Sequence, residues 1–539
     1  MQPEPSFDIV ITGGLLFEGT GAAPFQADIG IVGERIAAIG DLSQAKARRT
    51  IVAKNLHVAP GFIDIHTHSD ISAPFNPWQS SAIAMGVTSQ VVGNCGISLG
   101  LALHDPLFAF EQRWLAAYGK HIEWSNLNEF LRYLEEHGIG TNFLPLVGHG
   151  TLRKRVMGMA DRLPTDEELR AMCRLLEESL EAGAWGLSSG LEYLPSGYAD
   201  VNELAALCSL VRKYNGIYAT HLRNEGDTLV ESVQEALEVA SKAQVPLQLS
   251  HHKAEGIKNW GKTKITLAMV DRARAEGLDV QLDQYPYPAF MTSLVVQTLP
   301  RWAQQGTNEE MAARLKNPQF RCQIVNEILA AHPEWNDLEP WQNIRLGVCR
   351  GKPELQGRSI AELAQENQKH PVEYVLDLIV ETEGFVSAIN FSIGEEDIVR
   401  VMQHPYTAIG SDAVASQVNE RSLQDQIHPR VYGTFPRVLG RYVRQQQVLS
   451  EAEAIYKMTG LPATRMGLTD RGFLRVGCYA DITLYDPQRV IDTATFEHPH
   501  AYPIGIEWVL VNGTVALENG RLTHALAGKV LRANTCQPR

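Results

Sequence analysis

Short apolar segments alternate with amphipathic helical segments through the middle of the chain. Apolar residues recur about every 3.6 positions in residues 166–182, 228–243 and 266–275, which predicts helices there. The segments between such helices are short and apolar, and this alternation is the βα pattern of a parallel sheet or barrel. Nine segments qualify as strands: 62–66, 89–92, 142–147, 185–188, 217–221, 246–251, 279–283, 387–391 and 407–411. A closed barrel has eight strands, and the pattern does not identify the surplus one.

The two ends of the chain have a different pattern, with short β segments separated by glycine turns. The dipeptide Asn512-Gly513 predicts a tight hairpin, because both residues tolerate the positive φ of a type I′ turn. We therefore expect residues 1–60 and 467–539 to build one small β-sandwich domain around a barrel over 61–466. The expected strands at the ends are 7–11, 27–32, 35–39, 480–485, 506–511, 514–518 and 521–522.

Residues 286–345 interrupt the βα rhythm. This segment contains Trp302, Trp335 and Trp341, several prolines and short helical stretches, but no obvious strand. Because it follows a strand's carboxyl end, where barrels keep their active sites, we interpret it as a lid-like insertion over that face. The alternative is a stabilising excursion on the outside of the barrel.

Composition and charge narrow the class of protein. With 539 residues the chain exceeds one compact core, and 44% hydrophobic and 20% charged residues are typical of a globular protein. A net charge of −14 with no basic stripe argues against nucleic acid as a partner. We expect no secretory signal and no membrane partner, since no apolar run reaches the roughly 18 residues that span a bilayer. The cysteines are scattered singly along the chain and form no CxxC pair, which is typical of a protein of the reducing cytoplasm. The sequence does not predict an oligomeric state.

The most informative segment is Gly-Phe-Ile-Asp-Ile-His-Thr-His-Ser-Asp at 61–70. Read as a strand, it points Asp64, His66 and His68 to one face, because alternate side chains of a strand share a face. Neutral imidazoles bind zinc-like metals, so His66 and His68 could hold one cation or two adjacent ones.

Further candidate ligands fall at the ends of other predicted strands. Cys95 lies in a glycine-flanked turn, and His221, His251 and Asp412 each end an apolar segment. The carboxyl ends of barrel strands converge on one face, so these side chains are expected to meet. Zinc accepts thiolate and imidazole ligands, and a catalytic site leaves one position for water. Asp412 is the candidate to take a proton from that water and pass it to a leaving nitrogen.

These residues together resemble the N-acyl-D-amino-acid deacylases (D-aminoacylases) of the metal-dependent amidohydrolase superfamily. The resemblance covers nearly the whole chain. It rests on the 61–68 segment, Gly-Asn-Cys-Gly at 93–96, Thr-His-Leu-Arg-Asn-Glu-Gly at 220–226, Ser-His-His-Lys at 250–253, Gly-Ser-Asp at 410–412, His-Pro-Arg at 428–430 and Tyr-Gly-Thr-Phe-Pro-Arg at 432–437.

The resemblance implies an α/β fold, a distorted (β/α)8 TIM barrel, with a zinc ion bound tightly by Cys95, His221 and His251. It also implies that His66 and His68 contact a second, weaker metal position. Many members of the superfamily bridge two metals with a carboxylated lysine. The strand at 185–189 offers no lysine, and Cys95 would take the bridging place.

Substrate-binding residues are expected near the metal. An N-acyl amino acid has a free carboxylate, which Arg430 can bind in a bidentate manner, and the resemblance assigns carboxylate contacts to Lys253 as well. Either Tyr285 or Tyr287 could donate to the oxyanion of the tetrahedral intermediate. Tyr193 and Ser293 are further pocket candidates. Glu192, if it faces the pocket, would repel acidic substrate side chains and favour neutral ones.

The predicted function is zinc-dependent hydrolysis of N-acyl-D-amino acids to a carboxylate and a D-amino acid. One alternative is a cyclic amidohydrolase resembling dihydropyrimidinase, which the cysteine ligand and the missing lysine disfavour. Another is a catalytically inactive binding homologue, which the six filled positions disfavour. Stereochemistry and acyl-group preference depend on three-dimensional placement and do not follow from the sequence.

Overall fold

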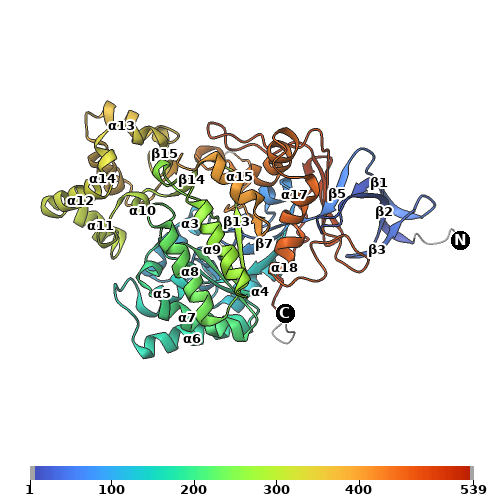
Figure 1. Cartoon of the computed structure of the whole chain (residues 1–539), viewed down its shortest axis with the longest axis horizontal. Coiled ribbons are helices and arrows are strands. Elements are labelled where there is room, and N and C mark those ends of the chain that lie inside the picture. The colour runs from blue at the N-terminus through green and yellow to red at the C-terminus, as the bar shows by residue number, and fades with distance from the viewer. Residues whose placement is uncertain (1–5, 420, 534–539) are drawn as a thin grey trace.

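The computed structural model describes residues 6–419 and 421–533. A β domain lies at one end of the molecule, the barrel lies in the middle, and a mostly helical insertion lies at the opposite end (Figure 1). Among the described residues, no helix is long and apolar enough to cross a membrane.

The middle of the chain forms the predicted parallel barrel. Three strands, β6 to β8, form one hydrogen-bonded sheet, and six strands form another in the order β17-β13-β12-β11-β10-β9. Only Leu146 separates β8 from β9, so these two short strands together occupy one barrel position. The nine strands of the two sheets therefore fill eight barrel positions. Their bounds are β6 Phe62–Asp64, β7 Val87–Val92, β8 Asn142–Pro145, β9 Val147–Gly148, β10 Gly186–Gly190, β11 Ile217–His221, β12 Leu247–Leu249, β13 Val280–Gln284 and β17 Thr407–Ile409.

Contacts just beyond the strand ends bring the first and last barrel positions together. Thr67 forms an isolated parallel bridge with Ala413, and the amide of Asp412 donates to the carbonyl of His66 at 2.8 Å. The closure therefore occurs where the predicted chemical residues lie, which places the 61–70 segment beside the late aspartate.

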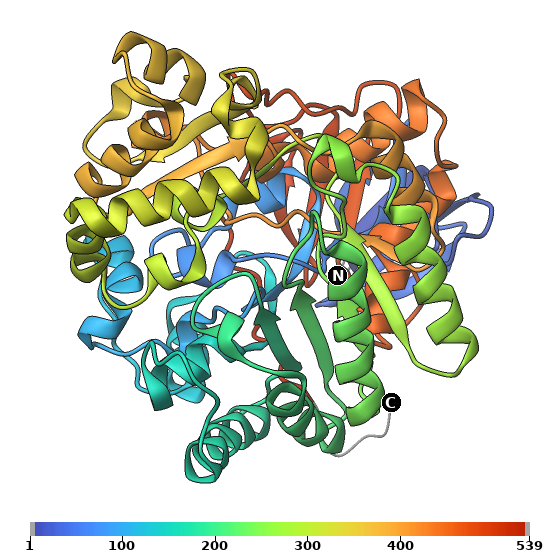
Figure 2. The same ribbon diagram turned by 60° about the vertical axis from the view of Figure 1, so that its left-hand side comes forward.

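Helices cover the outside of the barrel strands (Figure 2). The predicted helices are present as α6 (Asp166–Glu181), α8 (Leu229–Ala243) and α9 (Thr263–Ala275). Helix α6 begins where the hydroxyl of Thr165 accepts a hydrogen bond from the amide of Glu168 and the carboxylate of Glu168 accepts one from the amide of Thr165. Two otherwise unpaired backbone donors are thereby satisfied. Its buried residues Met172, Leu176 and Leu180 recur every four positions and face the core.

The surplus predicted strand is 387–391. It forms β16 (Val386–Asn390), which pairs antiparallel with β14 (Phe290–Ser293) and β15 (Ile344–Cys349) in a separate sheet. The prediction that it could belong to the barrel was wrong, because a short apolar segment looks the same in either kind of sheet.

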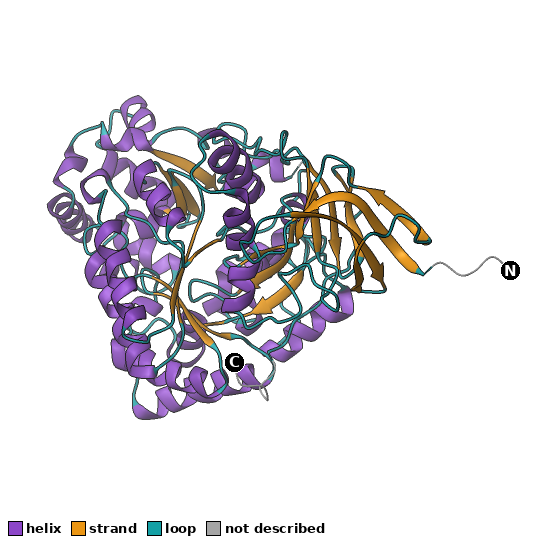
Figure 3. Cartoon of the chain, turned by 45° about the vertical axis from the view of Figure 1, so that its right-hand side comes forward, coloured by secondary structure: helices purple, strands orange, loops and turns teal. Residues whose placement is uncertain are grey.

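The interrupting segment is longer than expected and is not free of strands. It runs from β14 to β16 and packs a core of its own around the fully buried Trp341. Five helices lie between these strands: α10 Leu294–Thr298, α11 Asn308–Lys316, α12 Pro318–Ala331, α13 Ile360–Glu366 and α14 Pro371–Glu381. Figure 3 shows its small sheet at the far side of the helical region from the β domain.

Both ends of the chain share one nine-stranded sheet. Strand β18 pairs antiparallel with β5, which joins the C-terminal strands to the N-terminal ones. The predicted Asn512-Gly513 hairpin is confirmed between β19 and β20, with φ of 47° and 76° at its two central residues. The strands are β1 Phe7–Leu16, β2 Phe25–Val32, β3 Arg35–Gly40, β4 Ala47–Val52, β5 His57–Pro60, β18 Ile482–Tyr485, β19 Ile506–Val511, β20 Thr514–Glu518 and β21 Arg521–Leu522.

Candidate metal centre

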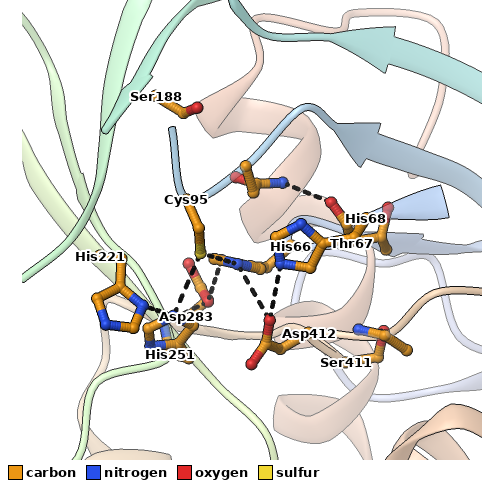
Figure 4. Close-up of polar contacts among 12 residues, drawn as sticks. His66, Thr67, His68, Cys95, Ser188, His221, His251, Asp283, Ser411 and Asp412 are labelled. Atoms are coloured by element: carbon orange, nitrogen blue, oxygen red, sulfur yellow. Dashed lines mark hydrogen bonds and ion pairs between the residues drawn. The ribbon is translucent and has the colours of Figure 1, made fainter. Parts of the chain in front are cut away.

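The structure brings the predicted chemical residues together at the carboxyl ends of the barrel strands (Figure 4). Their ligand atoms form two groups in which all atoms lie within 4.8 Å of one another. One group is Cys95, His221 and His251; the other is His66, His68, Cys95 and Asp412. Cys95 is common to both.

The first group has the shape of a zinc site. The Sγ atom of Cys95 lies 3.5 Å from Nε2 of His251, and Nδ1 of His221 lies 2.9 Å from the same Nε2. Zinc bonds of about 2.0–2.1 Å to nitrogen and about 2.3 Å to sulfur, arranged as a tetrahedron, keep N and S about 3.6 Å apart and two nitrogens about 3.3 Å apart. The donor set and its spacing therefore fit zinc.

The second group lies on the other side of Cys95. His66 Nε2 is 3.3 Å from Cys95 Sγ and 3.5 Å from Asp412 Oδ1, and His68 Nε2 is 3.1 Å from the same carboxylate oxygen. These residues could hold a second cation that shares the thiolate. The two histidines do not lie on a strand, however, because β6 ends at Asp64.

Three of the converging residues have positive φ although they are not glycine: Cys95 at 51°, His251 at 33° and Asp412 at 52°. Such backbone is uncommon outside glycine and concentrates at functional sites. Gly96 allows the close approach next to Cys95, since a Cβ there would lie 2.8 Å from the amide nitrogen of Gly190. The chain thus turns sharply at three strand ends and points the side chains inward.

The electrostatics of the site favour an ionised thiol and an ionised aspartate. Burial alone would raise the pKa of Cys95, but the imidazoles of His66 and His251 hold it well below its usual value. Burial would likewise raise the pKa of Asp412, but the guanidinium of Arg430 holds it well below the usual range. A thiolate is the form that binds metal.

A carboxylate lies behind three of the histidines, on the ring nitrogen opposite the convergence point. Glu225 Oε1 is 3.1 Å from His251 Nδ1, and Glu192 Oε2 is 2.8 Å from His221 Nε2. Asp283 Oδ1 lies 3.2 Å from Nδ1 of His66. Sequence reasoning missed Glu225 and Asp283 and considered Glu192 only as a pocket charge. Glu225 lies inside the quoted 220–226 motif and Asp283 ends the predicted strand 279–283, and these positions were the available signal.

The two predicted carboxylate-binding cations already have acidic partners. The ammonium of Lys253 forms a buried ion pair with Glu225 and lies 3.2 Å from the carbonyl of His251. Arg430 Nη1 lies 2.7 Å from Oδ2 of Asp412. Both cations border the candidate metal ligands, where the substrate-binding groups were expected.

The structure separates the two candidate tyrosines. Tyr285 is buried, and the charged groups of Lys253 and Arg430 lie 5.7 and 4.8 Å from its ring centre. Among the described residues its hydroxyl has no hydrogen-bond partner. Tyr287 instead packs against Arg437 and donates a long hydrogen bond of 3.5 Å to the carbonyl of Pro429.

Tyr193 and Ser293 occupy different places. The ring centre of Tyr193 lies 4.7 Å from that of His221, and its hydroxyl is 3.1 Å from that of Thr292, on the first strand of the insertion. The hydroxyl of Ser293 accepts from the amide of Val295 and caps helix α10. The insertion therefore reaches the rim of the site through Thr292, a contact that the sequence did not predict.

The comparisons with known proteins agree with this geometry. Residues 49–517 match the model of an amidohydrolase family. The D-aminoacylase of Alcaligenes xylosoxydans xylosoxydans is 36% identical over 97% of both chains, and the N-acyl-D-glutamate deacylase of the same organism is 37% identical over 98% of this chain and 97% of its own. The crystal structure of N-acyl-D-glutamate deacylase from Bordetella bronchiseptica, complexed with zinc and a phosphonate mimic of the tetrahedral intermediate, is 33% identical and superposes with a TM-score of 0.82 over 98% of this chain and 100% of its own. This chain belongs to the N-acyl-D-amino-acid deacylase family of amidohydrolases.

Proposed function

We propose that this protein hydrolyses the amide bond of N-acyl-D-amino acids with the help of zinc and releases a carboxylate and a free D-amino acid. The observation that supports this most strongly is the convergence of Cys95, His221 and His251 beside Asp412 at the carboxyl end of the barrel. A small N-acylated amino acid is the proposed partner, as for the relatives named deacylases.

Cys95, His221 and His251 are the residues that would hold the essential zinc, and His66 and His68 would contact a weaker second position that shares Cys95. Bound there, zinc would polarise the substrate carbonyl and make a water molecule acidic near neutral pH. The thiolate of Cys95, which belongs to both groups, would take the place that a carboxylated lysine fills in many amidohydrolases.

Asp412 is the proton carrier. Its carboxylate is ionised, because Arg430 lies 2.7 Å from one oxygen and His68 lies 3.1 Å from the other. It takes a proton from the attacking water and delivers it to the amide nitrogen as the C–N bond breaks. Both transfers occur at one carboxylate, so no second acid is needed.

Tyr285 stabilises the oxyanion. Its hydroxyl is a buried donor without a partner among the described residues, so it can donate to the developing negative oxygen without breaking another hydrogen bond. Lys253 and Arg430, whose charged groups both lie near its ring, hold the substrate carboxylate and fix the orientation of the amide.

Neutral substrate side chains are favoured. Relatives named for D-glutamate and for D-aspartate and a D-aminoacylase are similarly identical to this chain, at 37%, 35% and 36%, so identity does not distinguish between them. Glu192 places a partly exposed carboxylate beside Tyr193 and His221, and this negative charge opposes an acidic side chain.

We predict faster hydrolysis of N-acetyl-D-methionine than of N-acetyl-D-glutamate. Specificity constants for the two substrates, measured in parallel, check this expectation. Higher values for the glutamate derivative would show that Glu192 does not govern the choice.

The alternatives are disfavoured by the site. A cyclic amide has no free carboxylate for Lys253 and Arg430, and Cys95, which is common to both candidate ligand groups, would take the place of a bridging lysine. An inactive homologue would be expected to have lost a ligand or Asp412, yet all six side chains are present and converge.

We place the protein in the cytoplasm on its cysteine usage. Six cysteines among the described residues are free, and none of them pairs as a disulfide. Thiols persist in this form in reducing compartments.

The direct test of the proposed activity is hydrolysis of N-acetyl-D-methionine and N-acetyl-L-methionine, each with and without prior removal of zinc by a chelator. We expect hydrolysis of the D enantiomer alone, loss of activity after zinc removal and recovery when zinc is returned. Equal rates on both enantiomers, or activity that survives complete zinc removal, would refute the proposal.

A further inference from the structure

Glu225 touches both halves of the site. It lies on the loop that follows β11 and is only 3% exposed to solvent. Its two carboxylate oxygens contact different partners. Oε1 is 3.1 Å from Nδ1 of His251, and Oε2 forms the buried ion pair with Lys253. His251 is a predicted zinc ligand and Lys253 a predicted substrate-binding cation, so one carboxylate joins metal and substrate binding.

From this geometry we infer that Glu225 is a positioning residue that holds the zinc-binding form of His251 and the ammonium of Lys253 at the same time. The part of the inference that concerns Lys253 rests on the proposed function, since it assumes that the substrate has a free carboxylate.

The contact with His251 selects a tautomer. A neutral imidazole has one N–H and one lone pair, so a hydrogen bond from Nδ1–H to Glu225 leaves the lone pair on Nε2. Nε2 is the nitrogen that faces Cys95 and His221, at 3.5 and 2.9 Å. Glu225 thus orients the ring and leaves the correct nitrogen free for a metal.

The contact with Lys253 leaves one donor for a substrate. An ammonium has three N–H groups, and here one meets Glu225 and a second meets the carbonyl of His251 at 3.2 Å. Nζ also lies 3.0 Å from Nδ1 of His251, but that nitrogen cannot accept when its own proton points to Glu225. The third N–H is therefore available to a carboxylate in the site.

A glutamine at position 225 cannot serve both partners. Its oxygen can accept from His251, but its NH2 group then faces the ammonium of Lys253, which is left without a counter-charge. Turned the other way, its NH2 group would require Nδ1 of His251 to accept, and the proton would move to the nitrogen that must bind zinc. Glu192 offers a contrast, because its contact with His221 needs only an acceptor, which glutamine retains.

The test uses the purified full-length protein and the variant Glu225→Gln. Zinc affinity is measured by competition with a chromophoric chelator, and KM for N-acetyl-D-methionine is measured at saturating zinc. We expect zinc affinity to fall about tenfold or more and KM to rise about tenfold or more. Glu225→Asp, which keeps the charge on a shorter side chain, should lie between wild type and Glu225→Gln in both quantities.

Two further variants serve as comparisons. Asp397→Asn removes another buried carboxylate, one that accepts from the amide of Gly261 outside the site, and should leave zinc affinity and KM at wild-type values while lowering thermal stability. Glu192→Gln should lower zinc affinity less than Glu225→Gln does.

Each of the two proposed roles of Glu225, toward His251 and toward Lys253, is tested by its own measurement. Unchanged zinc affinity in folded Glu225→Gln overturns the role toward His251, and unchanged KM at saturating zinc overturns the role toward Lys253; either result ends the joint role. If Glu225→Gln does not fold, Glu225→Asp gives the same decision. Wild-type protein that binds zinc but does not hydrolyse N-acetyl-D-methionine would count against the proposed function, and the zinc competition would still decide the role toward His251.

Discussion

Individual side chains at this site hold more than one partner. Cys95 belongs to both groups of candidate metal ligands, Asp412 contacts both His68 and Arg430, and Glu225 contacts both His251 and Lys253. Each of these groups is buried or nearly so, where an unpaired charge is costly, and each therefore depends on its neighbours. Substitutions here are expected to alter metal binding, substrate binding and proton transfer unequally.

The two tyrosines provide a matched pair of variants at the residue scale. Tyr285→Phe removes the buried hydroxyl that has no partner among the described residues, and we expect kcat to fall by about 10²–10³-fold, as for the loss of one oxyanion donor. Tyr287→Phe removes a hydroxyl that faces Pro429 instead, so kcat should change little. Steady-state kinetics with N-acetyl-D-methionine decide between them, and a larger loss in Tyr287→Phe would reverse the assignment.

Secondary-structure elements explain why much of the site could be predicted. The parallel strands β7, β11 and β13 are short and fully buried and contain β-branched or aliphatic residues, so they could be predicted from the sequence. A polar residue at or just beyond the end of such a strand marks the chemical face of a barrel. No local sequence feature shows that a strand belongs to a separate antiparallel sheet, which is why 387–391 looked like a barrel strand. The carboxylate partners of His251 and His221 depend on the three-dimensional path of the loops that carry them, and the positive φ at Cys95 depends on tertiary packing. The local pattern of apolar and polar residues predicts neither.

Lys457, on α17 (Glu451–Met458), gives a prediction at the scale of elements. Its buried ammonium donates to the carbonyls of His404 and Thr407 at 2.6 and 3.2 Å, at the start of β17, and burial lowers its pKa from 10.5 to about 8. Between pH 8 and 10.5 the unfolded chain therefore binds the proton that the folded chain has released, so this lysine makes the free energy of unfolding rise with pH across that window.

Lys457→Met removes that titration. We expect the stability of wild type relative to Lys457→Met to increase between pH 8 and 10.5 and to stay constant from pH 6 to 8. Thermal or urea unfolding of both proteins across this range measures the difference. Parallel stability curves above pH 8 would contradict the lowered pKa.

At the scale of the whole molecule, the β domain and the helical insertion both contact the barrel through hydrogen bonds. Asn142 of β8 donates to Asp481 at 3.2 Å and accepts from Asn512 at 2.8 Å, and both partners belong to the β domain. At the other end, the insertion reaches the site where Thr292 meets Tyr193. The union of the two chain ends in one β domain could be predicted from their shared pattern of short strands and turns. The particular pairing of β5 with β18, more than 400 residues apart, could not be predicted from local pattern.

We propose that Cys95, His221 and His251 would hold the zinc ion needed for hydrolysis, while His66 and His68 would contact a weaker second position. The most direct measurement is the zinc retained per chain after dialysis against a weak chelator, together with activity on N-acetyl-D-methionine, for wild type, Cys95→Ala and His66→Ala. We predict that His66→Ala retains the tightly bound zinc of the wild type and that Cys95→Ala loses both zinc and activity. Full zinc retention and activity in Cys95→Ala, with loss of zinc in His66→Ala, would contradict the account.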